Sequence, residues 1–279
     1  GLNLYDLHGL ALVWSDPLAH TEDLQRLAFS ADGTLLASAG FDGLARLWRV
    51  LPEGRLQPLH VLTGHTDAVH AVAFSPDGRL LATAGYDGRV GVFDTASGAG
   101  KFFAAGKGQV LSVAFGPGGQ RIYVADRDDG RIRVWQIAGD PPVMQRELDA
   151  ARDFLMWAEP DVEGRQIAAV GRDYVVSILD LGTGDLLHSL PGHENAVFKA
   201  RFLPGGGQLA TAGVDATVRF WDLETASELF TLRLPTNQRQ PVPLWDFDLR
   251  CAPAACWLAV PLTRGKLALY QLAQPPALP

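Results

Sequence analysis

The stretch HTDAVHAVAFSPDGRLLATAGYDGRVGVF, from His65 to Phe93, decides the fold of this chain. Two other stretches share its pattern: HTEDLQRLAFSADGTLLASAGFDGLARLW, from His20 to Trp48, and HENAVFKARFLPGGGQLATAGVDATVRFW, from His193 to Trp221. In all three the histidine precedes the terminal aromatic residue by 28 positions. The first two histidines are 45 residues apart, and the third follows after 128 residues, about three periods of ~43. Such a period indicates an array of similar structural units.

Weaker copies of the pattern fill the rest of the sequence. They run from Gln109 to Trp135, from Asp153 to Asp180, and from Pro243 through Cys256 to Leu272. With the three strong copies they make six repeats.

Each copy has the same internal order of strands and turns. In the second copy an alternating apolar strand over 69–74 meets the turn SPDG at 75–78, and a second strand over 80–84 meets the turn YDG at 86–88. A third strand follows over 89–94, then a linker and a less regular fourth strand. Apolar residues at every second position between Pro, Asp and Gly turns are typical of antiparallel hairpins. Four such strands in ~43 residues predict an all-β fold in which each copy is one blade of a propeller.

The copies resemble WD40 repeats over nearly the whole chain. The dipeptides typical of that family are present as Gly64-His65, Gly192-His193 and Trp221-Asp222. In Phe93-Asp94 and Tyr5-Asp6 another aromatic residue replaces the tryptophan. The resemblance implies a WD40-type β-propeller with six blades of four antiparallel strands in a single domain over 1–279. The expected blades cover residues 20–64, 65–106, 107–149, 150–192, 193–240, and 241–272 together with 1–19.

The N-terminal segment is expected to close the ring. The last repeat supplies three strands and no fourth, and Leu10–Trp14 lies where a fourth strand should precede His20. A strand added there would remove an open sheet edge. The preceding stretch LNLYDL, residues 2–7, looks like a third strand of a further blade, so seven blades remain open as an alternative to six.

The resemblance also implies a buried clamp of hydrogen-bonded side chains inside the blades. It assigns His20, Ser38, Asp42 and Trp48 to the first clamp, and His193, Thr211, Asp215 and Trp221 to the fifth. In the second blade it assigns His65, Thr83 and Asp87, with Phe93 in place of the tryptophan. A buried aspartate needs hydrogen-bond donors, which imidazole, hydroxyl and indole groups supply. His20, Ser38 and Asp42 have the residue types of a hydrolase triad, but the same set recurs at His193, which favours a structural role.

Motifs for catalysis, metal binding or nucleotide binding have little support in the sequence. HExxH, CxxC, GxSxG, Walker and dinucleotide motifs are missing. The glycine-rich stretches 116–119 and 205–207 fall where hairpin turns belong, and His8, His60, His70 and His188 show no metal spacing. We therefore expect no catalysis, no metal and no cofactor.

Charge and cysteine content narrow the expected partners and location. The formal net charge is −7 with scattered basic residues, which argues against nucleic acid. No apolar run reaches the ~20 residues of a membrane helix, and no secretory signal is recognisable. A cytoplasmic protein with no membrane partner is expected, so Cys251 and Cys256 are interpreted as buried free thiols. A disulfide across a hairpin is the alternative that their spacing leaves open. The dominance of Ala, Gly, Leu and Pro, with few lysines, suggests a bacterial source.

Partners are expected on the face that carries the loops between second and third strands. Two positions per blade point there in proteins of the family that this chain resembles. The residues aligned before the clamp aspartate are Phe41, Tyr86, Asp128, Arg172 and Val214. Those aligned near the start of the first strand are Gln25, His70, Leu111, Phe154, Phe198 and Trp245. Aromatic residues are frequent in this set, and rings at the centre of an interface are typical energetic anchors.

From these residues we select seven expected partner-binding positions: Phe41, His70, Tyr86, Phe154, Arg172, Phe198 and Trp245. The expected function is a protein–protein interaction scaffold or sensor module, whose partner is a protein or an adjacent effector domain of a larger regulatory protein. The alternatives are a propeller that senses a small ligand or peptide, and a propeller enzyme with its site at the channel mouth.

Overall fold

The structure is a computed structural model that describes residues 2–6, 11–234, 244–252, 255–261 and 267–272. Within these residues all regular secondary structure is β-strand. The chain divides into two compact units, Gly1–Leu148 and Asp149–Pro279, which are described separately.

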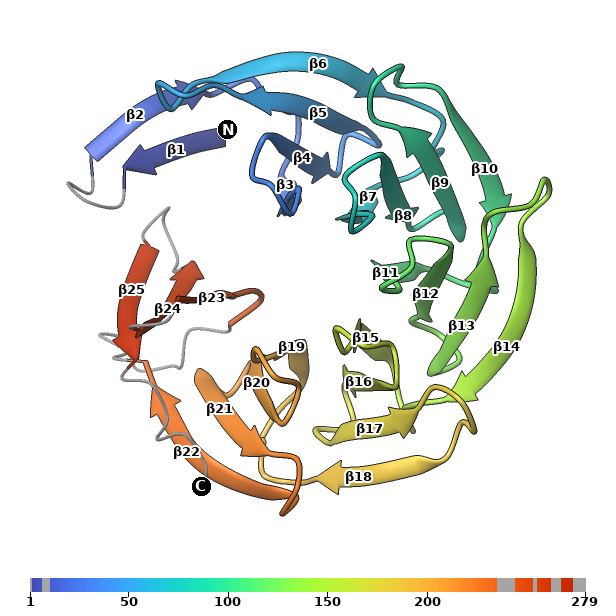
Figure 1. Cartoon of the computed structure of the whole chain (residues 1–279), viewed down its shortest axis with the longest axis vertical. Coiled ribbons are helices and arrows are strands. Elements are labelled where there is room, and N and C mark those ends of the chain that lie inside the picture. The colour runs from blue at the N-terminus through green and yellow to red at the C-terminus, as the bar shows by residue number, and fades with distance from the viewer. Residues whose placement is uncertain (1, 7–10, 235–243, 253–254, 262–266, 273–279) are drawn as a thin grey trace. The chain divides into compact units, whose positions relative to one another are not determined.

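The first unit holds a hairpin and three four-stranded antiparallel sheets. The hairpin consists of β1 (Leu2–Asp6) and β2 (Ala11–Asp16). The sheets are β3 (Leu24–Phe29), β4 (Leu35–Gly40), β5 (Ala45–Val50) and β6 (Leu56–Leu62); β7 (Val69–Phe74), β8 (Leu80–Gly85), β9 (Arg89–Asp94) and β10 (Gly100–Ala104); and β11 (Val110–Phe115), β12 (Arg121–Asp126), β13 (Arg131–Gln136) and β14 (Val143–Asp149). In each sheet the strands are paired in chain order. The first strands β3, β7 and β11 lie next to one another, and the fourth strands are outermost (Figure 1).

The second unit has two four-stranded sheets and one of three strands. They are β15 (Leu155–Pro160), β16 (Gln166–Gly171), β17 (Val176–Asp180) and β18 (Leu186–Leu190); β19 (Val197–Phe202), β20 (Gln208–Gly213), β21 (Thr217–Asp222) and β22 (Ser227–Arg233); and β23 (Asp248–Ala252), β24 (Ala255–Pro261) and β25 (Leu267–Leu272).

The expected all-β propeller class is confirmed. Six repeats form six antiparallel blades, five with four strands and the last with three among the described residues. The N-terminal strand expected to fill the last blade, Leu10–Trp14, corresponds to β2, which pairs with β1. Residues 7–10 lie outside the described part of the chain. Closure would join a strand of one unit to a sheet of the other, and it stays a prediction.

A repeated turn sets the register between the first two strands of the first and second blades. The Ser75 hydroxyl donates to the Asp77 carboxylate at 2.6 Å and accepts from the Leu80 amide at 2.9 Å. Ser30 makes the same contacts with Asp32 and Leu35. Gly78 has φ of +70°, a left-handed conformation that glycine adopts without strain. The sequence SPDG therefore holds the hairpin through side-chain bonds as well as backbone pairing.

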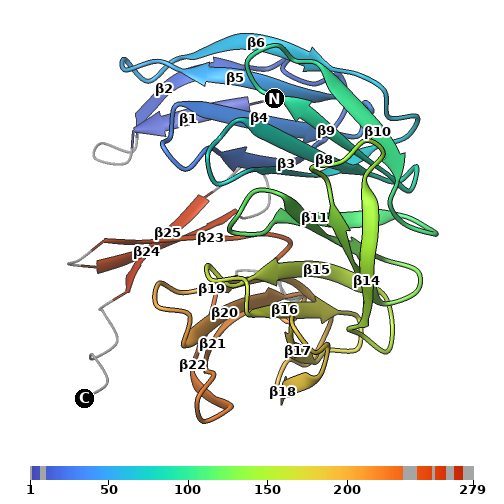
Figure 2. The same ribbon diagram turned by 45° about the vertical axis from the view of Figure 1, so that its right-hand side comes forward.

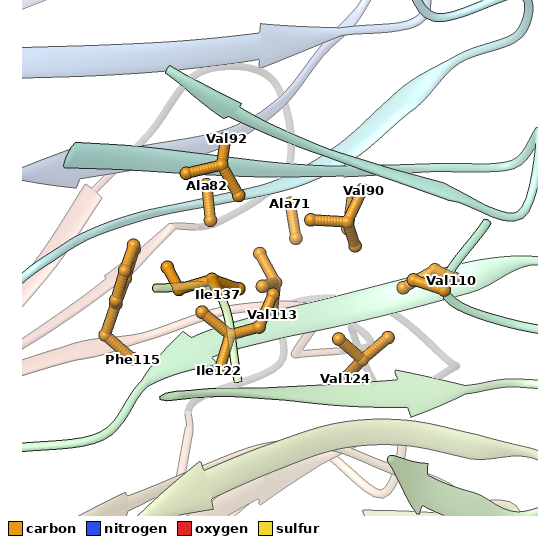
Figure 3. Close-up of a cluster of buried hydrophobic side chains, with 12 residues drawn as sticks. Ala71, Ala82, Val90, Val92, Val110, Val113, Phe115, Ile122, Val124 and Ile137 are labelled. Atoms are coloured by element: carbon orange, nitrogen blue, oxygen red, sulfur yellow. The ribbon is translucent and has the colours of Figure 1, made fainter. Parts of the chain in front are cut away.

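Neighbouring sheets of the first unit lie face to face (Figure 2), with apolar side chains between them. Between the second and third sheets, alanines and valines of one face meet larger residues of the next (Figure 3). Ala71, Ala82 and Val92 lie on one side, and Val113 and Ile122 on the other. Burying such side chains contributes about 25 cal/mol per Å² of apolar area removed from water. The small residues let the backbones of adjacent blades approach closely.

The expectation of two free thiols is wrong. Cys256 is disulfide-bonded, and no described cysteine is free. The backbone register places Cys251 directly opposite Cys256 in the hairpin of β23 and β24. Residues that face each other in an antiparallel pair have Cβ atoms about 4.5–5.5 Å apart, a relationship that the sequence spacing alone leaves undecided.

Candidate interaction surface and the buried clamps

The first blade contains a continuous hydrogen-bonded chain of four side chains. The indole of Trp48 donates to the Ser38 hydroxyl at 3.0 Å, and that hydroxyl lies 2.8 Å from Nε2 of His20. Nδ1 of His20 lies 2.9 Å from the Asp42 carboxylate. An indole only donates and a carboxylate only accepts, so the serine proton points to Nε2 and Nδ1–H points to Asp42. All four side chains are buried or nearly so.

The fifth blade repeats this chain with threonine in place of serine. Trp221 donates to the Thr211 hydroxyl at 2.8 Å, which lies 2.8 Å from Nε2 of His193, and Nδ1 of His193 lies 2.8 Å from Asp215. The backbone amide of Glu194 also donates to Asp215. Recurrence of one geometry in two blades, with no exposed hydroxyl in either, fits a structural clamp and not a hydrolase triad.

In the second blade aromatic packing replaces the missing indole. His65 lies 2.8 Å from Thr83 and 3.0 Å from Asp87. Phe93 has no donor, and the ring of Phe102 packs edge-on against both His65 and Phe93, at centroid distances of 4.9 and 5.4 Å. The clamp therefore loses one hydrogen bond and gains apolar contact.

Burial and hydrogen bonding set the charge states of the clamps. Burial lowers the pKa of His20 and of His65 below the usual histidine value, because it disfavours the imidazolium. Burial by itself raises the pKa of Asp215, but hydrogen bonds from His193, Thr217 and the Glu194 amide outweigh it and hold that pKa well below its ordinary range. The clamps of the first and second blades thus pair a neutral histidine with an ionised aspartate.

The third blade has a different clamp, which the sequence comparison missed. Asp126 is fully buried and accepts from Arg133 at 2.5 Å and from the Lys107 amide at 2.6 Å. Arg133 also binds Asp129 and, at 2.8 Å, Glu147. A cation paired with three carboxylates replaces the neutral histidine. The sequence signal was available, because Gly106 stands where the first, second and fifth blades have histidine, and a Cβ there would meet Asp126 at 2.8 Å.

Three aromatic side chains form a row across two sheets of the first unit, here called the aromatic row: Phe41, Tyr86 and His70. Phe41 precedes the clamp aspartate of the first blade, and its ring packs edge-on against Tyr86 with centroids 6.1 Å apart. His70 of β7 stacks on Tyr86 at 5.5 Å, and its Nδ1 lies 2.8 Å from the carbonyl of Leu111. Phe41 is 37% exposed, and Tyr86 and His70 are half-buried.

Backbone hydrogen bonds correct the sequence alignment of the third blade. The amides of Phe41 and Tyr86 bond to the carbonyls of Asp23 and Ala68, and in the third blade the equivalent bond runs from Arg127 to Gln109. Arg127 therefore takes the place that alignment gave to Asp128, because the third blade has one extra residue in this turn.

The fourth blade is shifted as well. The amide of Arg172 bonds to the carbonyl of Phe154, so Phe154 corresponds to Ala68. Leu155 pairs with Gly171 as Val69 pairs with Gly85, which puts Met156 at the position of His70. The strand LMWAEP does not alternate clearly between apolar and polar residues. Its alignment with the other first strands could therefore not be decided from the sequence.

In the second unit the remaining predicted residues form two pairs. The rings of Phe198 and Trp245 pack at a centroid distance of 4.5 Å, and Trp245 is 58% exposed. The guanidinium of Arg172 lies over Phe154 at 5.1 Å. Gln25 and Val214 are half-buried and Leu111 is buried. The structure thus joins Phe41, Tyr86 and His70 in one row, and groups Phe198 with Trp245 and Phe154 with Arg172.

The described residues were also compared with the requirements of a metal site and of a membrane-spanning helix. They contain no group of three or more His, Cys, Asp or Glu side chains that could hold a metal ion. They include no helix that is long and apolar enough to cross a membrane.

Comparisons with known proteins agree with the repeat structure. The family model described as "WD domain, G-beta repeat" matches residues 14–49, 56–94, 100–136 and 184–222, together more than half of the chain. The first match begins in β2, the other three begin in or just before a fourth strand, and each ends at or near the end of the following third strand. The first three strands of the fourth blade, β15–β17, are outside the matches, and this blade lacks the clamp histidine.

The relatives are eukaryotic proteins. The chain is 26% identical to THO complex subunit 3 of Arabidopsis thaliana over 82% of this chain and 71% of the relative. It is 24% identical to protein groucho of Drosophila melanogaster over 60% of this chain and 22% of that protein. It is 28% identical to E3 ubiquitin-protein ligase COP1 of Arabidopsis thaliana over 48% of this chain and 19% of that protein.

These relatives lend no support to a bacterial source, and the chain spans less than a quarter of groucho and COP1. The repeat period, the recurring clamps and the family match lead to one conclusion: this chain belongs to the WD40 repeat family.

Proposed function

We propose that this chain is a non-enzymatic protein–protein interaction module that binds a protein partner, or an adjacent effector domain, through the aromatic row. The observation that carries the proposal is the contact of Phe41, Tyr86 and His70 across two blades, with part of each ring open to solvent. Partially exposed rings on a rigid support lose little conformational entropy on binding, and aromatic residues are enriched among interface hot spots.

Polar and charged groups border the aromatic row, so that it has an apolar centre and a polar rim. Tyr86 carries a hydroxyl, and burial raises its pKa, so it stays a neutral hydrogen-bond donor at physiological pH. The charge of Arg127 acts on the same phenol. Arg127 is partly exposed and binds Gln109. A ring cluster beside an arginine is the composition found at the centre of many protein interfaces.

The pairs of the second unit extend the proposal. Phe198 with Trp245 and Phe154 with Arg172 present aromatic and cationic groups of the same kind. We assign them a secondary role in the same binding function, with Arg172 as a directional contact to a carboxylate of the partner. The name of THO complex subunit 3 describes a component of an assembly, which agrees with this class of function. A cytoplasmic location, without nucleic-acid or membrane partners, is part of the proposal.

The proposal is tested by affinity capture with three versions of the chain, followed by quantitative mass spectrometry. These are the wild type, the double variant Phe41→Ala/Tyr86→Ala, and the control double variant Val143→Ala/Met144→Ala. The control residues are exposed apolar side chains of β14 in the same unit, at 59% and 44% exposure. The proposal requires proteins captured by the wild type and control and lost from the aromatic double variant. Equal capture by all three versions would show that the aromatic row is not the binding surface.

A further inference from the structure

The fourth blade keeps the clamp aspartate, Asp173, without a clamp. The residues at the positions of the histidine, the hydroxyl and the tryptophan have no polar side-chain group: Ala151, Ala169 and Leu179. The carboxylate of Asp173 accepts from two backbone amides instead, from Arg152 at 3.0 Å and from Val175 at 3.4 Å. In this blade the aspartate therefore fixes the loop before β15 against the turn between β16 and β17.

That turn carries Tyr174, an exposed tyrosine with φ of +66°, a conformation that glycine adopts without strain. The first three blades have glycine at this position, with φ between +67° and +75°: Gly43, Gly88 and Gly130. The fifth blade has a buried alanine there, Ala216. The conformation is unfavourable for a residue with a Cβ atom, and Tyr174 is 45% exposed, so packing offsets little of the strain. Strain of this kind at an exposed side chain points to a function for that side chain.

Two exposed arginines accompany the tyrosine, and the three residues are here called the Arg–Tyr patch: Arg152, Arg172 and Tyr174. The bond from the Arg152 amide to Asp173 places Arg152 beside the turn that carries the other two residues. The guanidinium of Arg172 lies over the ring of Phe154 at 5.1 Å, which supports it through a cation–π contact. Within the part of the chain that the structure describes, neither guanidinium forms an ion pair with a carboxylate. Both groups are therefore available to an anionic ligand.

The acidic side chains of the same loops bond to the backbone. Asp153 accepts from the Phe154 amide at 2.7 Å, and Asp173 accepts from the two amides described above. Their charges still lie close to the arginines, which disfavours a strand of nucleic acid, because its phosphates require a row of cations. The formal net charge of −7 acts in the same direction. A short acidic peptide needs only one or two cations and an apolar contact, and the Arg–Tyr patch offers both.

We propose that the Arg–Tyr patch binds an acidic segment of a partner protein. Carboxylates of that segment pair with the guanidinium groups of Arg152 and Arg172, in the bidentate geometry that suits the two groups. An apolar side chain of the segment covers the ring of Tyr174, whose turn is held by Asp173 before binding. The inference deepens the proposed function and rests on it, because it names the chemistry of a partner that the interaction module binds through its second unit.

The probe for this site is a synthetic peptide with four glutamates around a central phenylalanine, labelled with a neutral dye. The control peptide has glutamine at each glutamate position, so that it differs only in charge. Fluorescence anisotropy of the labelled peptide gives its dissociation constant from the full chain. We expect the acidic peptide to bind about tenfold or more tightly than the control peptide, and to lose affinity as the salt concentration rises.

Arg152→Gln and Arg172→Gln should each raise the dissociation constant of the acidic peptide about fivefold or more. The matched control is Arg165→Gln, which removes the same charge at the other end of β16. The side chain of Arg165 is 75% exposed and directly precedes that strand. This control should change the dissociation constant by less than about twofold, because water and salt screen a charge at that distance.

Tyr174→Asn separates binding from stability. Asparagine tolerates the left-handed conformation better than tyrosine does, so the melting temperature should stay the same or rise. The dissociation constant of the acidic peptide should rise about threefold or more, because the apolar contact is lost. A lower melting temperature with unchanged affinity would instead give Tyr174 a structural role and contradict its part in binding.

Three further results would overturn the proposal. The first is equal affinity for the acidic peptide and its control, or no binding of either. The second is an effect of Arg165→Gln as large as that of Arg172→Gln, which would mean non-specific attraction. The third is tighter binding of a single-stranded oligothymidine that is lost in Arg172→Gln, which would make nucleic acid the ligand. Phe41→Ala/Tyr86→Ala should leave the peptide affinity unchanged, so a failure of this inference and a failure of the aromatic row are read separately.

Discussion

The imidazole of His70 stacks on the ring of Tyr86, with centroids 5.5 Å apart and ring planes inclined by 20°. Nδ1 of His70 is held at 2.8 Å by the carbonyl of Leu111 in the next blade. The histidine therefore fixes the direction of the tyrosine ring and ties it to the neighbouring sheet. A ring that is held before binding loses less entropy when a partner covers it.

His70→Ala should weaken partner binding without removing it, because Tyr86 remains but loses its support. We expect a loss of about 0.5–1.5 kcal/mol in binding free energy, the usual value of a stacked ring pair. Titration calorimetry with a captured partner measures it. His70→Phe keeps a stacking ring and should recover part of the loss. Identical affinities for the wild type and both variants would show that the stack does not position Tyr86.

The clamps should act on stability and not on chemistry. Asp42→Ala and Asp215→Ala each leave a buried histidine and a backbone amide without an acceptor, and should lower the free energy of unfolding by roughly 2–4 kcal/mol. Denaturant unfolding measures this. Trp48→Phe removes a single indole hydrogen bond and should cost only about 1 kcal/mol. A stable Asp215→Ala protein that has lost partner binding would contradict a purely structural role.

Stability should fall in mild acid. The pKa values of His20 and His65 are lowered by burial in the folded state, while unfolded histidine titrates near about 6.5. Below that pH the unfolded chain binds protons that the folded chain does not, so the free energy of unfolding decreases as pH falls. Each such histidine contributes a slope of up to about 1.4 kcal/mol per pH unit.

Unfolding curves between pH 8 and about 5 test this effect, and the slope is independent of the starting stability. Removing one clamp histidine by His65→Asn should reduce the slope by about one proton. A flat profile over this range would mean that these histidines take up protons at the same pH in the folded and the unfolded chain. Below about pH 4 the lowered pKa values of Asp42 and Asp87 add to the loss.

The arginine clamp of the third blade should be a strongly coupled pair. Arg133→Met leaves the fully buried Asp126 carboxyl without its cationic partner, which should cost about 3–5 kcal/mol. Arg133→Met/Asp126→Asn removes both charges and should be more stable than the sum of the single losses predicts. A double-mutant cycle of unfolding free energies measures the coupling. Additive losses would show that the two side chains act independently.

The sequence predicted the blades and clamps because both depend on local patterns. The SPDG turn, the alternation of Val72 and Phe74, and the fixed spacing of His, Ser or Thr, Asp and Trp each specify local geometry within one repeat. The aromatic residues Phe41 and Tyr86 were identified by the same register. What they contact depends on the neighbouring blade, and the sequence carries no direct signal for the stack of His70 on Tyr86.

The weaker repeats show where this reasoning fails. One extra residue before Gly130 moves Arg127 into the place expected for Asp128. In the third blade Arg133 and Asp126 replace a histidine clamp through contacts between residues that no family pattern connects. The disulfide of Cys256 depended on the register of the β23–β24 hairpin, which places position 251 opposite it.

The most direct test of the central claim is the affinity of Tyr86→Ala for a purified captured partner. If the aromatic row is the binding surface, the dissociation constant should rise about 5- to 150-fold, corresponding to roughly 1–3 kcal/mol. The unfolding free energy should stay within about 1 kcal/mol of the wild type. An unchanged dissociation constant for Tyr86→Ala, together with weakened binding by Val143→Ala/Met144→Ala, would place the interface on the outer strands and contradict the account.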